Sequence, residues 1–405
     1  MTATPSDLRA DLPVWARIGL LSFGGPAGQI ALMHRECVET RGWIDEDRFL
    51  HALNFCMLLP GPEAMQLATY IGWLRGGWRG GVLAGGLFVL PGILAIMALS
   101  WVYVLAGDVD WIAGAFFGLK AAIIAIVAQA LWRIGRKALK GPVALAIAGA
   151  AFTALFVFDL PFPLVVLAAA ALGYARAPKH RGDLPPPEGR TGGTALVWAA
   201  LWLVPVAALA LTLGPQDGLT QVAVFFSQMA VLTFGGAYAV LAWVAQAAVD
   251  TQGWLAPGQM LDGLAMAETT PGPLIMVTQF VGFMAGWQAG GLGLATLAAL
   301  ITTWVTFAPC FLWIFALAPH AERLRHSPAL AGALQAVTAA VVGVIANLAL
   351  LFALHALWPE GAFDPWAAGL TALALIAAFL LKAGPGMLIL GAALAGAGLR
   401  LAGLA

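Results

Sequence analysis

The sequence has few charged residues and no excess of either sign. Only 10% of its 405 residues are Asp, Glu, Lys or Arg, whereas soluble domains carry about 25%. The 20 basic and 20 acidic side chains cancel, so no surplus positive charge is left for a nucleic acid. With 61% hydrophobic residues and a mean hydropathy of +0.89, the chain is predicted to be an all-α polytopic membrane protein surrounded by lipid.

Residues that carry cofactor or metal chemistry are also scarce. The three cysteines, Cys37, Cys56 and Cys310, are too scattered for a disulfide framework or a zinc site. The six histidines form no HExxH motif, and no Walker A motif is present. No cofactor and no metal are therefore expected, and the chain is not predicted to be an enzyme. A membrane-embedded enzyme or cofactor protein stays open as the alternative class.

Apolar runs of helical length follow one another along most of the chain. The N-terminus, MTATPSDLRADLPVW, lacks the basic region of a secretory signal, so the first run is expected to be retained. A charged, Pro-rich segment at 176–193 separates six runs from seven, which predicts roughly 13 membrane segments. The runs are 12–33, 48–73, 80–105, 111–132, 141–158, 161–176, 195–213, 220–248, 256–285, 289–318, 328–357, 364–381 and 384–402.

The two parts of the sequence repeat one another. LLPGPEAMQ at 58–66 recurs 211 residues later within TTPGPLIM at 269–276, and the same spacing carries the FGG of 23–25 onto 234–236. Further on, KAAIIAIVAQ matches TAAVVGVIAN at a spacing of 218. Such self-similarity indicates a duplication. The predicted domains are a first repeat at 1–175, a cytoplasmic linker at 176–193, an extra transmembrane helix at 194–214 and a second repeat at 215–405.

The second repeat is expected to be inverted relative to the first. Six crossings followed by one extra helix place it upside down in the membrane. With the N-terminus in the cytoplasm, most basic residues also lie on the cytoplasmic side, as the positive-inside rule requires. The other side receives only Arg35, Arg41, Arg48 and Arg400. Inverted repeats with helices broken at matching positions are typical of secondary transporters.

Several of these motifs resemble those of a known family. LLSFGGPAGQIALMHRE, RGWIDEDRF, LLPGPEAMQLATYIGW and RGGWRGGVLAGGLFVLPG, with LTFGGAYAVL and AETTPGPLIMVTQFVGF in the second half, look like the chromate ion transporter family in its long, two-domain form. The resemblance implies chromate efflux, and thus chromate resistance, across the bacterial inner membrane. Sulfate or another tetrahedral oxyanion is the alternative substrate. A homodimer is one assembly that the sequence allows.

The broken helices suit an anion. Where a helix restarts after Pro-Gly-Pro, its first N–H groups lack intrahelical partners and carry partial positive charge. The alternative is that these motifs only let helices kink and pack closely. The residues expected to bind the substrate are Gly24, Gly25, Pro60, Gly61, Pro62, Gln66, Lys120, Gly235, Gly236, Thr270, Pro271, Gly272 and Pro273.

Ionisable residues inside the apolar runs are rare and costly, which favours functional roles for them. Lys120 is interpreted as the fixed positive charge, with an ion pair to Glu63 or an interfacial position as the alternatives. Glu63 and Glu268 flank the two PGP motifs from opposite sides. A carboxylate beside an anion site repels the substrate unless it is protonated, so both are predicted to serve proton coupling or gating. Helix capping remains the alternative for them.

Overall fold

The computed structural model describes residues 7–107, 109–178, 192–234, 236–320 and 327–404, and this part of the chain contains helices and no strands. The first half comprises α1 (Leu8–Leu20), α2 (Gly25–His34), the π-helix η1 (Arg35–Thr40), α3 (Glu46–Cys56), α4 (Glu63–Ala106), α5 (Asp110–Ala138), α6 (Pro142–Phe156) and α7 (Phe162–Arg176). The helix α8 (Gly192–Thr212) follows.

The second half comprises α9 (Gly218–Leu232), α10 (Ala237–Gln246), the π-helix η2 (Ala247–Thr251), α11 (Pro257–Thr269), η3 (Leu274–Met276), α12 (Val277–Gly290), α13 (Leu292–Leu317), η4 (Ala318–His320), α15 (Pro328–Leu357), η5 (Pro359–Gly361), α16 (Pro365–Phe379) and α17 (Pro385–Leu401). The predicted runs therefore correspond closely to helices, and helices end and restart at FGG and at PGP in both halves.

The same irregularities recur in the two halves. Each half carries a π-helical turn after its second helix, η1 and η2. Each also has a sharp bend at a glycine, Gly77 at φ 60° and ψ −153° within α4, and Gly291 at φ 81° and ψ −167° between α12 and α13. Residues with side chains rarely adopt these conformations, so glycine sets the bends. The duplicated sequence thus forms elements in the same order.

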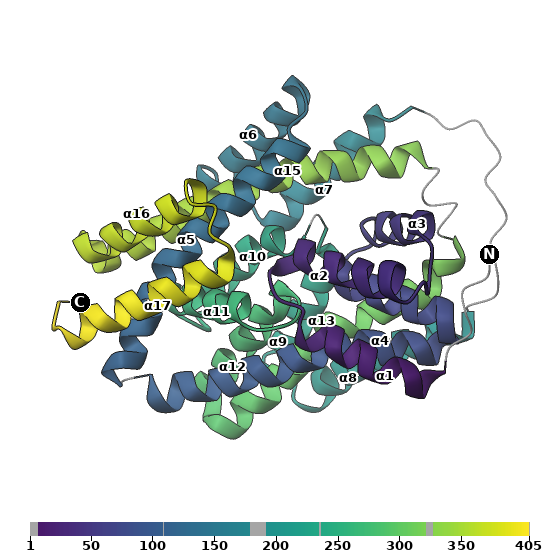
Figure 1. The fold of residues 1–405 in the computed structure, drawn as a ribbon, viewed down its shortest axis with the longest axis horizontal. Helices are drawn as coiled ribbons and strands as arrows, with labels where there is room; N and C mark the ends of the chain where they lie inside the picture. Colours follow the sequence, from purple (N-terminus) through teal and green to yellow (C-terminus); the bar gives the residue numbers. More distant parts are fainter. Residues whose placement is uncertain (1–6, 108, 179–191, 235, 321–326, 405) are drawn as a thin grey trace.

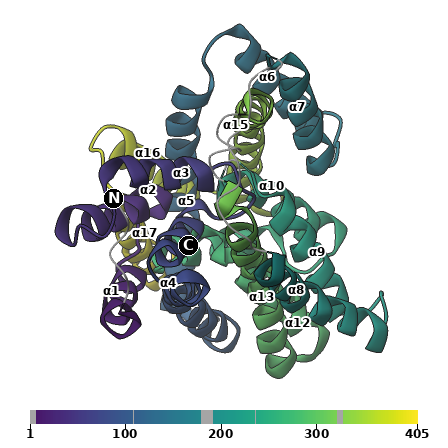
Figure 2. The ribbon, with the colours of Figure 1, turned by 90° about the vertical axis from the view of Figure 1, so that its right-hand side faces the viewer.

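The two halves exchange their last helical hairpins. The α6/α7 hairpin packs on α15 of the second half, and the α16/α17 hairpin packs on α5 of the first (Figure 1). In Figure 2, α6, α7 and α15 form one group and α5, α16 and α17 another. Small residues permit the close approach: a Cβ on Gly118 would lie 1.8 Å from Ala392 O, and one on Gly173 2.2 Å from Gly332 O.

Five helices of the described chain are long and apolar enough to cross a membrane: Glu63–Ala106, Asp110–Ala138, Gly193–Thr212, Leu292–His320 and Pro328–Leu357. The other apolar helices have 10–17 residues. A helix of 15 residues is roughly 22 Å long, less than the ~30 Å hydrocarbon core. The chain is a multi-pass membrane protein, but its helix lengths do not confirm thirteen crossings.

Candidate functional site

Each PGP loop is hydrogen-bonded to the segment that precedes the FGG of the other half. The Gly61 N–H donates to Thr233 O at 2.8 Å, and the Gly272 N–H donates to Ser22 O at 3.0 Å. Ser22 and Thr233 are themselves 211 residues apart, so the two contacts are equivalent and reciprocal. We call them the first crossing (Gly61 with Thr233) and the second crossing (Gly272 with Ser22).

Glycine is required at the centre of both crossings. Gly61 has φ 121° and Gly272 has φ 102°, in the region that residues with a Cβ avoid. A Cβ on Gly61 would lie 2.9 Å from Gln66 Nε2 and 3.0 Å from Cys310 Sγ, and one on Gly272 would lie 3.3 Å from Gly92 Cα. The first PGP loop therefore packs against α13 of the second half, and the second PGP loop packs against α4 of the first half.

At the first crossing, the buried Gln66 side chain turns back onto the loop. Its Nε2 donates to Pro60 O at 2.7 Å, and its Oε1 has no partner among the described residues. The Gln66 backbone N–H donates to Pro62 O at 3.1 Å. The backbone N–H groups without a helical acceptor are thus those of Glu63, Ala64 and Met65, and the backbone N–H of Gln66 does not belong to them.

At the second crossing, Ser22 and Gln29 brace the loop. Gln29 Nε2 donates to Gly272 O at 2.6 Å and to Ser22 O at 3.1 Å. The Gly272 N–H also approaches Ser22 Oγ at 2.9 Å. As with Gln66, the Oε1 of Gln29 is buried and lacks a partner in the described part of the chain. Both crossings therefore hold an acceptor oxygen that a water or another hydrogen-bond donor would satisfy.

The FGG glycines lie in open space. Gly24, Gly25 and Gly236 have φ of 83°, 69° and 99°, and a Cβ built on any of them meets nothing within 4 Å. Gly235 lies outside the described residues. The described FGG glycines therefore have free space around them, with Gly24 exposed and Gly25 and Gly236 half-buried, whereas the PGP loops beside them are tightly packed.

Thr270, Pro271 and Pro273 frame the second PGP loop, but the Thr270 hydroxyl serves its own helix. Its Oγ1 donates to Ala267 O at 3.4 Å. The helix restarts differently in the two halves. Pro62 leads directly into α4 with Glu63 as its first residue, whereas Pro273 leads into the 3-10 turn η3 before α12 begins.

Lys120 lies away from the crossings and pairs with Asp262. Its Nζ is 3.7 Å from Asp262 Oδ2, and Tyr103 OH donates to the same oxygen at 2.9 Å. The described residues give no ion pair between Lys120 and Glu63, so that alternative was wrong. Asp262 is eight residues before Thr270 on α11, roughly 12 Å along the helix. The structure therefore joins the PGP and FGG motifs but does not bring Lys120 into contact with them.

The two predicted carboxylates have different surroundings. Glu63, at the start of α4, is partly buried, and its carboxylate interacts with its own backbone N–H. The Glu268 carboxylate accepts a short hydrogen bond from Tyr238 OH, and the positive charge of Arg133 acts on it through space. Glu268 thus has a hydrogen-bond partner on another helix, while Glu63 stands at the start of α4 directly after the first PGP loop.

Sequence reasoning missed Ser22, Thr233 and Gln29, and it did not pair Lys120 with Asp262 or Asp262 with Tyr103. Ser22 and Thr233 had a detectable signal, because both stand immediately before FGG at the repeat spacing of 211. Asp262 had no such signal, because the first-half residue at that spacing is His51. The three cysteines are free and buried, as expected of packing residues.

Comparison with known proteins identifies relatives over most of the chain. The family model "Chromate transporter" matches residues 12–174 and again 220–397. The chromate transport protein of Pseudomonas aeruginosa is 36% identical over 339 residues, 81% of this chain and 77% of the relative. The chromate transport protein of Cupriavidus metallidurans is 31% identical over 354 residues, which are 87% of this chain and 84% of the relative. The probable chromate transport protein of Synechococcus elongatus is 32% identical over 334 residues, which are 82% of this chain and 81% of the relative. No solved structure matches the chain.

Proposed function

The chain belongs to the chromate transporter family, and from that premise we propose that it exports chromate from the bacterial cytoplasm across the inner membrane. Members of this family are transporters rather than enzymes, and the family assignment supports an oxyanion as the substrate. Sulfate or another tetrahedral oxyanion is the second candidate, because nothing at the crossings distinguishes one tetrahedral anion from another.

The proposed architecture is a pair of inverted repeats, 1–175 and 215–405, with a cytoplasmic N-terminus and roughly 13 membrane segments. The 176–193 linker lies in the cytoplasm, and the helix within 194–214 crosses the membrane once between the repeats. The reciprocal hydrogen bonds and the exchanged hairpins support a twofold relation between the halves. The family model matching each half once supports the duplication.

The proposed substrate site lies where the two crossings meet the open FGG segments. The observation that carries it is the reciprocal pair of hydrogen bonds from Gly61 to Thr233 and from Gly272 to Ser22. The first bond lies between the start of α4, where the N–H groups of Ala64 and Met65 lack a helical acceptor, and the segment of Gly236. The second lies between the start of η3 and the segment of Gly24 and Gly25. The free N–H groups attract an oxyanion. The unpaired oxygens of Gln29 and Gln66 favour a hydrogen-bearing ligand, either water or a protonated oxyanion.

Lys120, Glu63 and Glu268 act around this site in the proposal. Lys120 supplies positive charge along the approach, because its side chain remains 31% exposed beside Asp262. Glu63 and Glu268 couple transport to protons or gate it. In Glu63→Gln the pH profile of transport is expected to flatten, and an unchanged profile at normal rate would confine Glu63 to capping α4.

The membrane potential suffices to drive export. One charge moved through 100 mV gains about 2.3 kcal/mol, so a dianion leaving a negative cytoplasm gains about 4.6 kcal/mol, which sustains a gradient on the order of 2,000-fold. Accumulating uptake would instead need at least three co-transported cations to reverse the charge movement.

Chromate flux in inside-out vesicles tests the proposal. We expect an inside-positive potential to drive chromate accumulation, and we expect Gly61→Ala to reduce it strongly because a Cβ does not fit at the first crossing. Gly149→Ala is the matched control, since a Cβ there meets nothing within 4 Å. Accumulation of sulfate with no chromate flux would identify the second candidate, and chromate movement only in the uptake direction would contradict efflux.

A further inference from the structure

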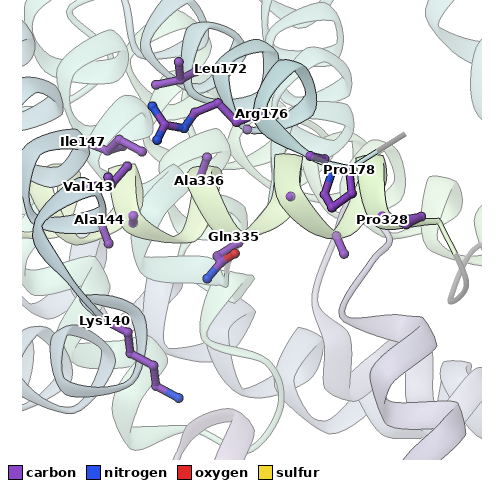
Figure 3. A pocket seen from close by; sticks show the side chains of 15 residues that line it. Lys140, Val143, Ala144, Ile147, Leu172, Arg176, Pro178, Pro328, Gln335 and Ala336 are labelled. Atoms are coloured by element: carbon purple, nitrogen blue, oxygen red, sulfur yellow. The ribbon is translucent and has the colours of Figure 1, made fainter. Parts of the chain in front are cut away.

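A groove runs where the α6/α7 hairpin of the first half lies on α15 of the second (Figure 3). It consists of two adjoining cavities of about 450 Å³ and about 330 Å³. Ile147 and Leu172 line both, so the two cavities adjoin at these side chains. Nothing in the proposed transport mechanism uses this groove.

The first cavity is basic. Lys140 and Arg176 line it together with the amide of Gln335, and none of the described residues that line it is acidic. Neither cation pairs with a carboxylate of the described chain. In Figure 3 the Arg176 side chain lies above α15 and the Lys140 side chain lies below it, with Gln335 between them. α6 begins at Pro142 and α15 begins at Pro328. Val143 and Pro328 line the cavity from opposite sides in Figure 3, and each helix N-terminus adds positive potential on its own side.

The second cavity is apolar. The described residues that line it are Ala, Ile, Leu and Val from α6, α7, the loop between them and α15. From Val143 in the basic cavity to Ala154 in the apolar one, the groove follows α6 for 11 residues, roughly 16 Å. That is about half of the ~30 Å hydrocarbon core, the depth of one leaflet.

We propose that this groove binds one anionic phospholipid, with its headgroup in the basic cavity that Lys140 and Arg176 line from either side of α15 (Figure 3) and an acyl chain in the apolar cavity. A free oxyanion would satisfy the basic end but leave the apolar cavity empty, whereas a lipid fills both. A zwitterionic lipid carries an ammonium that the same two cations repel. In the proposed orientation the basic end faces the cytoplasmic leaflet, which is rich in anionic lipid. The bound lipid bridges the two halves, because the hairpin and α15 belong to different repeats.

Native mass spectrometry of the purified full chain tests this inference. The protein is equilibrated with phosphatidylglycerol and phosphatidylcholine in equal amounts, and the lipid that stays bound is counted. We expect one tightly retained phosphatidylglycerol. Lys140→Gln/Arg176→Gln should weaken its affinity about thirtyfold, because each basic residue near an anionic headgroup contributes about 1 kcal/mol.

Arg9→Gln/Lys382→Gln is the charge-matched control, since both residues are exposed, lie outside the groove and belong to the same proposed side of the membrane. Equal retention in the two double variants, or equal retention of the two lipids by the native chain, would overturn the proposal. Displacement of the lipid by millimolar inorganic phosphate would also overturn it, because the site would then recognise a free anion.

A second pair of variants covers the case in which the charge variant does not fold. Ala168 lines the apolar cavity and Ala171 does not, although both are exposed on α7. Ala168→Phe should lose the phosphatidylglycerol while keeping both cations, and Ala171→Phe should retain it. Retention by both would rule out the groove as the acyl-chain site.

Discussion

The two halves make the same backbone crossing but surround it with different side chains. At the second crossing two side-chain hydrogen bonds hold Gly272, one to Ser22 Oγ and one from Gln29 Nε2, and Gln29 Nε2 also donates to Ser22 O. At the first crossing the Thr233 hydroxyl instead donates to Met229 O in its own helix, and Gln66 bonds only within its loop. The second crossing is the more strongly braced of the two.

The residues at which the helices restart after PGP also differ between the two halves. The residue after the first PGP is Glu63, whereas the residue after the second is Leu274. Both halves therefore keep the glycine-dependent backbone, while the side chain after PGP is an ionisable carboxylate in one half and an apolar leucine in the other. We infer that the first crossing carries more of the substrate's interactions and the second provides a rigid counterpart.

The largest expected difference between the halves is in stability. Asp11 of α1 accepts two hydrogen bonds from Arg75 of α4, at 2.7 and 3.1 Å, with both side chains 5% exposed. The second half has Val222 at the position of Asp11. Asp11→Ala should lower the free energy of unfolding by about 3–5 kcal/mol, the cost of breaking a buried pair. Val222→Ala should cost less, and thermal unfolding in detergent compares them. Equal losses would contradict this difference.

The two PGP glycines come next. Gly61→Ala and Gly272→Ala should each add about 1–3 kcal/mol of backbone strain, with further cost from the Cβ contacts at the crossings. We expect chromate flux per folded molecule to fall about tenfold or more in Gly61→Ala, and Gly272→Ala to lose mainly folded protein. Flux and thermal stability measured on the same samples separate the effects. A greater loss of flux per folded molecule in Gly272→Ala would reverse the assignment.

Lys120 provides a smaller and more specific effect. The second-half residue equivalent to Lys120 is Thr338, whose hydroxyl donates to Leu334 O in its own helix. Lys120→Met should reduce chromate flux while protein levels stay normal, and Lys120→Arg should keep part of it. Lost folding in Lys120→Met that Asp262→Asn restores would instead indicate a structural ion pair. Thr338→Val serves as the control and should change neither flux nor folding.

The smallest effect is a pH dependence confined to the first half. A hydrogen bond from His34 to Glu46, with the charge of Glu39 nearby, raises the pKa of His34 above 6.5. Because the pKa is raised on folding, this stabilisation is present below pH 6.5 and is lost as the pH rises through the folded-state pKa. Solvent screening keeps it small. Thermal unfolding between pH 5 and 8 should show a slope that His34→Gln removes. Persistence of that slope in the variant would assign it to another group.

The helices and their breaks were predictable because their causes are local. Apolar runs of helical length, Pro-Gly-Pro and FGG act within a few residues, and the helices begin and end close to the predicted limits. The bend at Gly77 falls in the gap between the predicted runs 48–73 and 80–105, and the bend at Gly291 lies just after the gap between 256–285 and 289–318. The π-helical turns carry no such local signal in an apolar sequence. The number of full crossings also depends on where short helices lie in the membrane, which composition does not specify.

The sequence by itself determined a duplicated, helical membrane chain whose helices break at FGG and PGP, because periodicity, proline and glycine act locally. Only the tertiary structure decided which broken segments meet. It placed Gly61 on Thr233 and Gly272 on Ser22, gave Lys120 the carboxylate of Asp262 rather than that of Glu63, and exchanged the terminal hairpins between the halves. These contacts join residues more than a hundred positions apart, and they follow from how two folded repeats pack, which no local pattern encodes.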